Sequence, residues 1–386
     1  MFPRSLRLSH RFLSTVNSST FKADNLRVTL CSPEKRKPKP DDPNTHKFGT
    51  LFTDHLLSIR WTLEKGWDDP EIIPFQNFSL HPATKTLHYS QNLFEGLKCY
   101  RGDDGKIRLF RPEKNMERMV TSAKRASLAT FNPDELLKCL KKFIMVDADW
   151  VPSLPNTSLY IRPTFMGIEP TLGVNSADEA LLFVIFSPVG AYFGTKIVPV
   201  SLLADPAWVR AWPGGAGSNK LASNYGPTLS IQKNAVNKGC HQVLWLFGDD
   251  EQLTEAGAMN IFAFLINDKG EKELITPPLE QGVILPGITR DSILTITRDW
   301  NQFKVTERKI TMDEVIKTLE QGRLLEMFGA GTAAVVSPIS RINYQDKDYL
   351  IPTMESKDAI AQKLLKTIMD IQYGRIEYKN WTQIVC

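Results

Sequence analysis

The sequence of 386 residues lacks the patterns that mark several protein classes. Its five cysteines are odd in number, scattered and without a CxxC pair, which gives no support to a disulfide framework or a zinc site. Its six histidines form no HExxH or HxH group, so we expect no catalytic metal. No apolar run approaches the roughly 18 residues of a membrane span, so we expect no membrane partner. With 42% hydrophobic and 23% charged residues, the composition fits a globular chain of about two domains.

Excess positive charge gathers at the start of the chain. Residues 1–23 carry four basic residues and no acidic one, and the remaining 43 basic residues balance 43 acidic ones. We therefore expect no nucleic-acid binding driven by overall charge. An Arg- and Ser-rich amphipathic start without an apolar central run is typical of an organelle transit peptide, although a disordered basic tail has a similar composition. We expect residues 1–23 to direct the chain to the mitochondrial matrix.

The rest of the chain divides into two parts. Residues 24–47 are rich in proline and charge, which is typical of a linker. We expect a small domain over 48–188, an interdomain loop over 189–200 and a large domain over 201–386. Periodicity predicts helices at 112–128, 133–146, after 286–289, at 311–321 and at 356–373, and strands at 180–186, 242–247 and 260–266. Strands and helices mix without a regular βαβ order, so the predicted fold class is α+β.

One lysine stands alone in the stretch GSNKLASNYGP of residues 217–227. Lys220 is the only charged residue between Arg210 and Lys233. Neither a P-loop, GxxxxGK[ST], nor the dinucleotide pattern GxGxxG fits its surroundings. A lysine held in a tight pocket can lose its proton and condense with a carbonyl group as a Schiff base. The competing interpretation is an ordinary solvated lysine, which is what most lysines are.

Three further stretches strengthen the first interpretation. Glu255 lies in LTEAGAMN, between two apolar segments, where a carboxylate is either a solvated turn residue or the partner of a buried cation. The stretches LPGITR (285–290) and FGAGTAAVV (328–336) each place glycine and threonine where a strand gives way to a turn. Free amides and a hydroxyl at such a place can bind phosphate. An amine, an acid and two phosphate sites together are typical of a pyridoxal phosphate site.

These stretches, with HYSQNLFEGLK (88–98) and SLYIRPTFMG (158–167), resemble the branched-chain amino acid aminotransferases of the mitochondrial type. That family belongs to the fold-type IV, D-amino-acid-aminotransferase-like pyridoxal phosphate enzymes. The resemblance runs in order from about Phe48 to the C-terminus. It implies a two-domain enzyme that moves the amino group of leucine, isoleucine or valine reversibly to 2-oxoglutarate, in branched-chain amino acid biosynthesis and catabolism.

The resemblance also assigns roles around the cofactor. Lys220 matches the Schiff-base lysine, which moves the proton at the substrate Cα. Glu255 matches the acid beside the pyridine nitrogen, and Tyr225 matches the phenol bonded to the ring's 3-oxygen. The positions that match the phosphate cup are Arg118, Arg210, Ile288, Thr289 and Thr332. On its pattern alone Arg118 lies off the apolar face of its helix and would be interpreted as solvated.

A branched aliphatic substrate calls for an apolar, aromatic pocket with a few donors for its carboxylate. The positions resembling the family's pocket wall are Phe48, Tyr89, Phe94, Tyr160, Val174 and Tyr192. We expect the amides of Thr332 and Ala333, with Tyr160 and Arg162 nearby, to hold the α-carboxylate. Arg162 is also the candidate for the second carboxylate of glutamate. Part of this pocket comes from the neighbouring subunit in the family, which implies a homodimer with its active site at the domain and dimer interface.

The chain departs from the family in two places. Ala334 and Ser337 stand where animal members have a CxxC pair, so thiol control through that pair is absent. Ala258 stands where those members have a threonine three residues after the acid, and we place no cofactor bond there. Two alternatives stay open: another fold-type IV enzyme, either a D-amino-acid transaminase or an aminodeoxychorismate lyase, and a non-catalytic binding or regulatory protein on the same scaffold.

Overall fold

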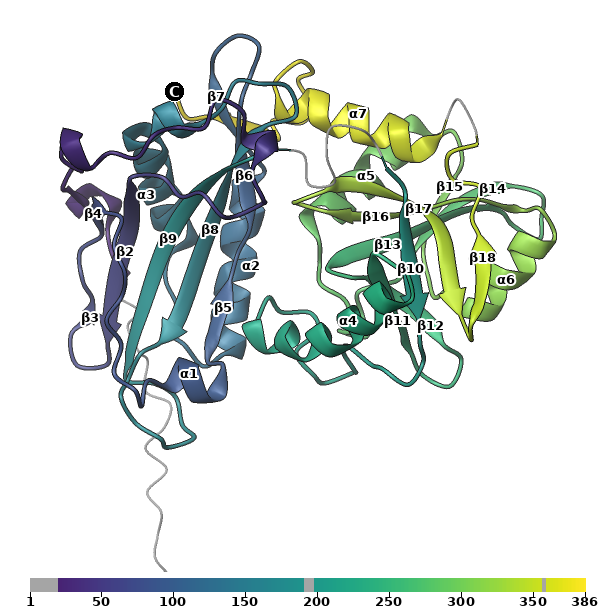
Figure 1. Ribbon diagram of the computed structural model, residues 1–386, viewed down its shortest axis with the longest axis horizontal. Coiled ribbons are helices and arrows are strands. Elements are labelled where there is room, and N and C mark those ends of the chain that lie inside the picture. The colour runs from purple at the N-terminus through teal and green to yellow at the C-terminus, as the bar shows by residue number, and fades with distance from the viewer. Residues whose placement is uncertain (1–19, 191–197, 356–358) are drawn as a thin grey trace, which may run out of the picture.

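The computed structural model describes residues 20–190, 198–355 and 359–386. Over these residues the chain forms two large sheets that lie beside each other, each with helices against it (Figure 1). Both sheets contain parallel and antiparallel pairs, and their strands do not alternate regularly with helices. This confirms the predicted α+β class.

The first sheet has ten strands and a single continuous core. Its order is β1 (Arg27–Val28), β4 (Glu71–Pro74), β2 (His55–Thr62), β9 (Glu179–Val189), β8 (Ser158–Gly167), β6 (Leu97–Arg101), β7 (Ile107–Phe110) and β19 (Thr382–Ile384), with β3 (Gly66–Trp67) paired to β2 and β5 (Asn92–Phe94) paired to β8. Helices α2 (Pro112–Arg125) and α3 (Pro133–Val146) supply buried side chains to its core, while α1 (Lys85–Tyr89) lies near β8.

Helices α2 and α3 form for reasons visible in the sequence. Each begins with proline, whose fixed φ suits the first helical position. The side chain of Asn132 accepts a hydrogen bond from the amide of Asp134 and caps α3. The apolar face of α3 packs on the sheet, where the rings of Phe143 and Phe186 stack with centroids 3.9 Å apart. Burying each ring stabilises the fold by about 1.5–3 kcal/mol.

The second sheet has nine strands and closes on itself. Its order is β12 (Gln252–Ala256), β11 (Gln242–Phe247), β10 (Val200–Ala204), β17 (Val335–Tyr344), β16 (Leu324–Gly331), β13 (Met259–Ile266), β14 (Lys272–Thr276) and β15 (Lys304–Glu307), with β18 (Lys347–Leu350) paired to β17. A further pairing of β12 with β13 completes a ring of strands. The helices packed around it are α4 (Leu229–Asn237), α5 (Ile288–Trp300), α6 (Met312–Glu320) and α7 (Ile360–Gln372).

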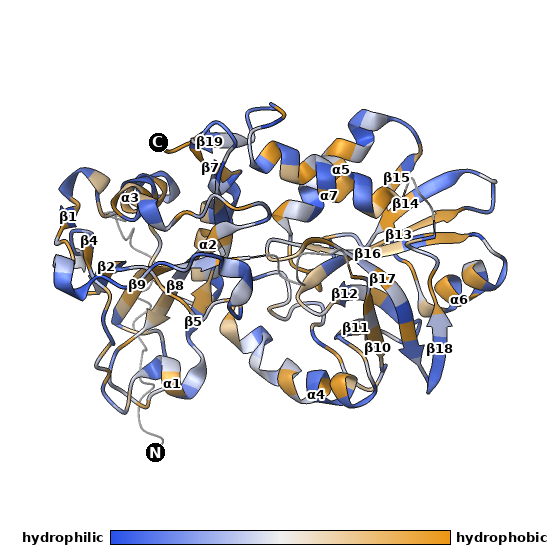
Figure 2. Ribbon diagram, turned by 45° about the horizontal axis from the view of Figure 1, so that its top comes forward, coloured by the Kyte–Doolittle hydropathy of each residue, from blue (hydrophilic) through white to orange (hydrophobic). Residues whose placement is uncertain are grey.

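Colouring by hydropathy shows apolar strands in both sheets and helices with one apolar and one polar side (Figure 2). In the part of the chain that the structure describes, no helix combines the length and the apolar character needed to cross a membrane. The sequence-predicted helices and strands all occur, with ends that differ by a few residues. The expected interdomain loop falls between the end of β9 and the start of β10, and its residues 191–197 lie outside the described residues.

The segment expected to be a linker packs instead against the first sheet. Strand β1 pairs with β4, and the amide of Cys31 donates to the ring of His55 at 2.8 Å. Phe21 and Ala23, which belong to the expected transit peptide, are also buried in the core. The amide of Ala23 donates to the carboxylate of Glu135 on α3 at 2.7 Å. Proline and charge predicted a linker, but the pairing of β1 with β4 and the burial of Phe21 and Ala23 just before it hold the segment on the sheet. Residues 1–19 of the expected transit peptide lie outside the described residues.

Candidate active site

The segment that carries Lys220 joins the two sheets. The amide of Lys220 donates to the hydroxyl of Ser122 on α2 at 3.0 Å, and its carbonyl accepts from the amide of Phe94 on β5 at 3.1 Å. The side-chain amide of Asn224 donates to two carbonyls earlier in the same segment. Gly217 lies so close to Ala211 that a Cβ would overlap with it. Small and amide residues are therefore needed here, because the backbone itself makes the contact between the sheets.

The amine of Lys220 lies among aromatic rings rather than beside an acid. Its Nζ donates to the hydroxyl of Tyr225 at 3.1 Å and lies 4.9 Å from the ring centre of Phe94. Desolvation, with a further contribution from the positive charge of Arg118, lowers the pKa of Lys220 to about 8. Such an amine can take up and release a proton close to neutral pH.

Glu255 is a buried carboxylate with a fixed set of partners. It accepts the amide of Leu285 at 2.8 Å and forms an ion pair with Arg210 at 2.7 Å. The side-chain amide of Asn260 donates to it at 3.4 Å and to the carbonyl of Leu285 at 2.9 Å. Burial raises the pKa of Glu255, while Arg210 opposes that rise. The paired guanidinium therefore favours the ionised form of the acid.

Arg210 makes contacts that the resemblance did not indicate. The resemblance put it in the phosphate cup, whereas its contacts in the structure are with Glu255 and with the carbonyl of Gly217 at 3.2 Å. A buried carboxylate needs a counter-charge, and Arg210 supplies it. Its Nε is buried and has no hydrogen-bond partner among the described residues.

The start of α5 offers free amides beside a second arginine. Gly287 precedes the helix and provides no capping side chain, so the first-turn amides of Ile288 and Thr289 have no intrahelical acceptor. A Cβ on Gly287 would overlap with Asn260, so only glycine allows this approach. Arg118 donates to the carbonyl of Pro286 at 3.1 Å. The arginine therefore lies at the positive end of the helix, an arrangement that suits an anion.

Arg118 is fixed by a residue that the sequence analysis missed. Its guanidinium binds the fully buried carboxylate of Glu95 through two hydrogen bonds of 2.8 Å. Asn115 donates to the same carboxylate at 2.8 Å. Burial would raise the pKa of Glu95, but the bidentate pair with Arg118 leaves it below its usual value. The acid stands in FEGLK, within a stretch already singled out, but no spacing rule links it to Arg118 on α2.

The turn between β16 and β17 carries Thr332 and Ala333. A second residue missed from the sequence, Lys98 on β6, donates to the carbonyl of Ala333 at 2.8 Å. Burial lowers the pKa of Lys98 to about 8. The turn is thereby tied to the first sheet, with its amides held near the sheet-to-sheet junction.

An unbroken series of aromatic and cationic contacts leads from Lys220 to Phe48. Phe94 lies against Tyr225, with ring centres 4.9 Å apart, and Arg162 lies over the ring of Phe94 at 4.7 Å. The guanidinium of Arg162 donates to the hydroxyl of Tyr160 at 2.8 Å, and Tyr160 contacts Phe48 edge to face at 5.0 Å. The Nε of Arg162 is buried without a partner among the described residues.

Three expected wall residues do not join this series. Val174 is 85% exposed and Tyr89 is 41% exposed, so neither encloses a pocket in its own chain. Tyr192 lies outside the described residues. The remaining members of the expected wall, Phe48, Phe94 and Tyr160, are brought together.

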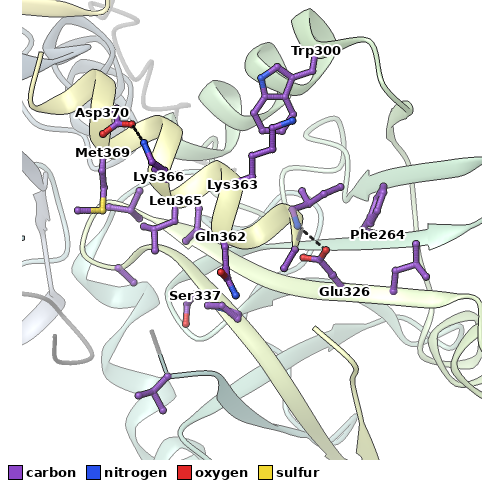
Figure 3. A pocket seen from close by; sticks show the side chains of 18 of the residues that line it. Phe264, Trp300, Glu326, Ser337, Gln362, Lys363, Leu365, Lys366, Met369 and Asp370 are labelled. Carbon is purple, nitrogen blue, oxygen red and sulfur yellow. Dashed lines mark hydrogen bonds and ion pairs between the residues drawn. The ribbon is translucent and has the colours of Figure 1, made fainter. Parts of the chain in front are cut away.

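A wide hollow of about 1740 Å³ is lined in part by the turn at Ala333, and Figure 3 shows it from close by. Lys98, Ser337 and residues of α7 line it, and Figure 3 shows Lys363 and Lys366 on α7 at its edge. Its described lining includes neither Lys220 nor Glu255. Volume alone therefore does not identify the reactive site, which is defined by the converging side chains.

Comparisons with known proteins show the family of the chain. The model of the amino-transferase class IV family matches residues 92–342. The cytosolic branched-chain-amino-acid aminotransferase of Ovis aries is 53% identical over 364 residues, which cover 94% of this chain and 93% of the relative. The mitochondrial branched-chain-amino-acid aminotransferase of Bos taurus is 52% identical over 358 residues, 92% and 90% of the two chains. The crystal structure of the T.th. branched-chain amino acid aminotransferase with pyridoxamine 5'-phosphate has a TM-score of 0.67 and 26% identity, covering 85% of this chain and 98% of that one.

Proposed function

We propose that the chain catalyses amino transfer with the side chains described above. It belongs to the class IV aminotransferases, and within them to the branched-chain-amino-acid aminotransferases. The reaction moves the amino group of leucine, isoleucine or valine reversibly to 2-oxoglutarate. The observation that carries the proposal is the desolvated amine of Lys220 in a site that also holds the buried, arginine-paired carboxylate of Glu255.

Class IV aminotransferases use pyridoxal phosphate, and the residues present fit that group. The free amides of α5 and Arg118 suit its phosphate. When bound, the cofactor supplies an electron sink for negative charge at the substrate Cα. We assign the binding of the cofactor to Lys220, to Tyr225 and, at its ring nitrogen, to Glu255. The residues assigned to its phosphate are Arg118, Ile288, Thr289 and Thr332.

Lys220 acts as the acid and base of the reaction. An amine with a pKa of about 8 exists in both forms near neutral pH, so it can remove the proton from the substrate Cα and return it. The hydroxyl of Tyr225, 3.1 Å from Nζ, orients the amine. Glu255 supplies a fixed negative charge, which Arg210 helps to keep ionised in spite of burial.

The aromatic series forms the wall against which the substrate side chain packs. Phe48, Phe94 and Tyr160 suit a branched aliphatic group, since they offer apolar surface and little else. The unused Nε of Arg162 suits a carboxylate, either the α-carboxylate or the second one of glutamate. The amides of Thr332 and Ala333 complete the carboxylate site.

The enzyme acts as a homodimer. The strong exposure of Val174 and Tyr89 supports this part of the proposal, because wall residues that face solvent in one chain can serve the site of a neighbour. Sedimentation of the purified protein measures the assembly, and a fully active monomer contradicts it.

The chain is a mitochondrial protein whose leader ends before Phe21 rather than at the expected residue 23. Burial of Phe21 and Ala23 supports this limit, because removing them would open the core of the first sheet. Comparing the location of the full-length protein with that of a variant lacking residues 1–19 tests it. Cytosolic residence of both forms contradicts the assignment.

The fold consists of a small domain from residue 48 to 188 and a large one from 201 to 386. The separate strand orders of the two sheets support this division. Residues 20–47 and the last strand, β19, which pairs with β7, belong with the small domain rather than with the expected linker and the large domain.

A spectroscopic half-reaction tests the activity directly. Holoprotein is mixed with leucine alone, and the visible absorbance of the cofactor is followed. Leucine is expected to convert the cofactor to its amino form, whereas D-alanine is expected to leave the spectrum unchanged. A response to D-alanine and not to leucine supports a D-amino-acid transaminase instead, and a protein that holds no cofactor supports a binding protein.

A further inference from the structure

A fully buried lysine lies outside the site described above. Lys85 begins α1, and its side chain is 0% exposed. Its Nζ forms an ion pair with Glu169 at 2.7 Å and donates to the side chain of Asn175 at 2.9 Å. The carbonyls of Asn175 and Ser176 lie at 3.3 and 3.2 Å. Lysine is among the residues least often buried completely, so this position requires a reason.

Glu169 also forms hydrogen bonds at both ends of the loop of residues 169–178. Its Oε2, which pairs with Lys85, also accepts the amide of Asp178 at 2.9 Å, and its Oε1 accepts the hydroxyl of Thr171 at 3.1 Å. The hydroxyl of Tyr89, at the far end of α1, donates to the carbonyl of Leu172 at 2.5 Å. Helix α1 and residues 169–178 thus form one braced unit, which we call the α1 lobe.

The α1 lobe exposes several apolar side chains. Leu172 is 62% exposed and Val174 85% exposed, and Leu87 and Tyr89 of α1 are exposed as well. Contiguous exposed apolar surface marks interaction sites, whereas single exposed apolar residues are common on soluble proteins. A buried ion pair adds little net stability because of its desolvation cost. The pair of Lys85 with Glu169 is therefore better explained by the loop shape that it fixes.

We propose that Lys85 is a positioning residue, whose ion pair with Glu169 holds Leu172 and Val174 in the shape that completes the substrate pocket of a second copy of this chain. The inference rests on the proposed homodimeric aminotransferase. The wall formed by Phe48, Phe94 and Tyr160 lacks the expected Val174 in its own chain. Loosening the lobe removes apolar contacts from the substrate side chain, and it leaves the proton transfer at Lys220 untouched.

The first test compares two identical substitutions. Lys85→Met removes the buried cation, and Lys65→Met changes an exposed lysine in the turn between β2 and β3. We expect Lys85→Met to raise KM for leucine about ten-fold, the size expected when a pocket loses one apolar contact. The kcat value and the KM for alanine, which does not reach the wall, should stay near those of the wild type. Lys65→Met should match the wild type, and an unchanged leucine KM in Lys85→Met overturns the proposal.

The second test asks which subunit the lobe serves. A heterodimer is purified through two different tags, with Lys85→Met in one subunit and Lys220→Ala in the other. Its only competent amine lies in the Lys85→Met subunit, and the intact lobe comes from the other chain. We expect the leucine KM to return to the wild-type value, with half the wild-type turnover per dimer. A KM that stays raised shows that Lys85 acts within its own subunit and overturns the proposal.

A variant that leaves the ion pair intact covers the case in which Lys85→Met does not fold. Leu172→Asp alters the outer surface of the lobe, and Leu63→Asp changes a leucine of similar exposure, 61%, in the turn after β2. Leu172→Asp should show the same raised KM and the same recovery in the heterodimer, and failure to recover overturns the proposal. Wild-type protein without leucine transamination refutes the proposed function itself, and a fully active wild-type monomer refutes the dimer and this inference together.

Discussion

Replacing Lys220 with methionine removes a charge from a poorly solvated position, so it should stabilise the cofactor-free protein. The surroundings lower the pKa of Lys220 from 10.5 to about 8, and each pKa unit corresponds to ~1.4 kcal/mol. Folding with a protonated amine therefore costs about 3 kcal/mol at neutral pH. The lost hydrogen bond to Tyr225 offsets about 1 kcal/mol of this gain. We expect Lys220→Met to raise the free energy of unfolding by about 2 kcal/mol while abolishing transamination.

The pH dependence of this difference has a defined sign. The unfolded lysine keeps its proton up to a pH near 10.5, whereas the folded one loses it from about 8. Between these values the unfolded state binds more protons, so the stability of the wild type rises with pH. The advantage of Lys220→Met should be constant below about pH 8 and shrink above it by up to ~1.4 kcal/mol per pH unit.

Urea unfolding of the cofactor-free proteins, at one protein concentration and at pH values from about 7 to 9.5, measures this difference. Lys233→Met, which changes an exposed lysine of α4, serves as the control and should show no such dependence. A Lys220→Met protein that is less stable than the wild type at pH 7 refutes the reasoning. So does a stability advantage that is unchanged at the highest pH.

Three further substitutions test the other charged groups. Glu255→Gln should lower kcat about 10²–10³-fold, the usual cost of losing one fixed charge near developing charge, and an unchanged kcat removes Glu255 from the mechanism. Arg210→Met removes the charge that opposes the effect of burial on Glu255, so the pKa of that acid should rise further. The acidic limb of the plot of kcat against pH should therefore move to higher pH. A limb that stays in place or moves to lower pH contradicts the pairing of Arg210 with Glu255. Arg162→Gln should raise KM for glutamate more than KM for leucine, since only glutamate brings a second carboxylate, and an equal rise in both assigns Arg162 to the α-carboxylate alone.

Much of the fold could be predicted from local sequence patterns. Helix α3 occupies the predicted range, because its apolar spacing, its proline and the capping Asn132 all act within one segment. Strand β11 likewise follows from a single apolar run. The packing of residues 20–47 was missed because it depends on Phe21 and Ala23 entering a core built by distant parts of the chain.

The site residues also divide into those that local sequence patterns predict and those that depend on contacts with distant segments. Lys220, Glu255 and the start of α5 stand in stretches whose composition is unusual enough to be noticed. The burial of Arg118 could not be predicted from the pattern of its helix, because its ion-pair partner, Glu95, lies on another segment. The partner of Arg210 was likewise hidden, since Glu255 follows it only after an intervening helix and strand. Pairwise contacts between distant segments are decided by the tertiary fold, and local patterns do not contain them.

The attachment point of the cofactor tests the account most directly. Holoprotein is treated with borohydride, digested, and analysed by mass spectrometry for peptides that carry the reduced cofactor. The adduct is expected on Lys220, within the segment that joins the two sheets. An adduct on another lysine, or a fully active protein from which none can be recovered, contradicts the assignment of this amine as the reactive group.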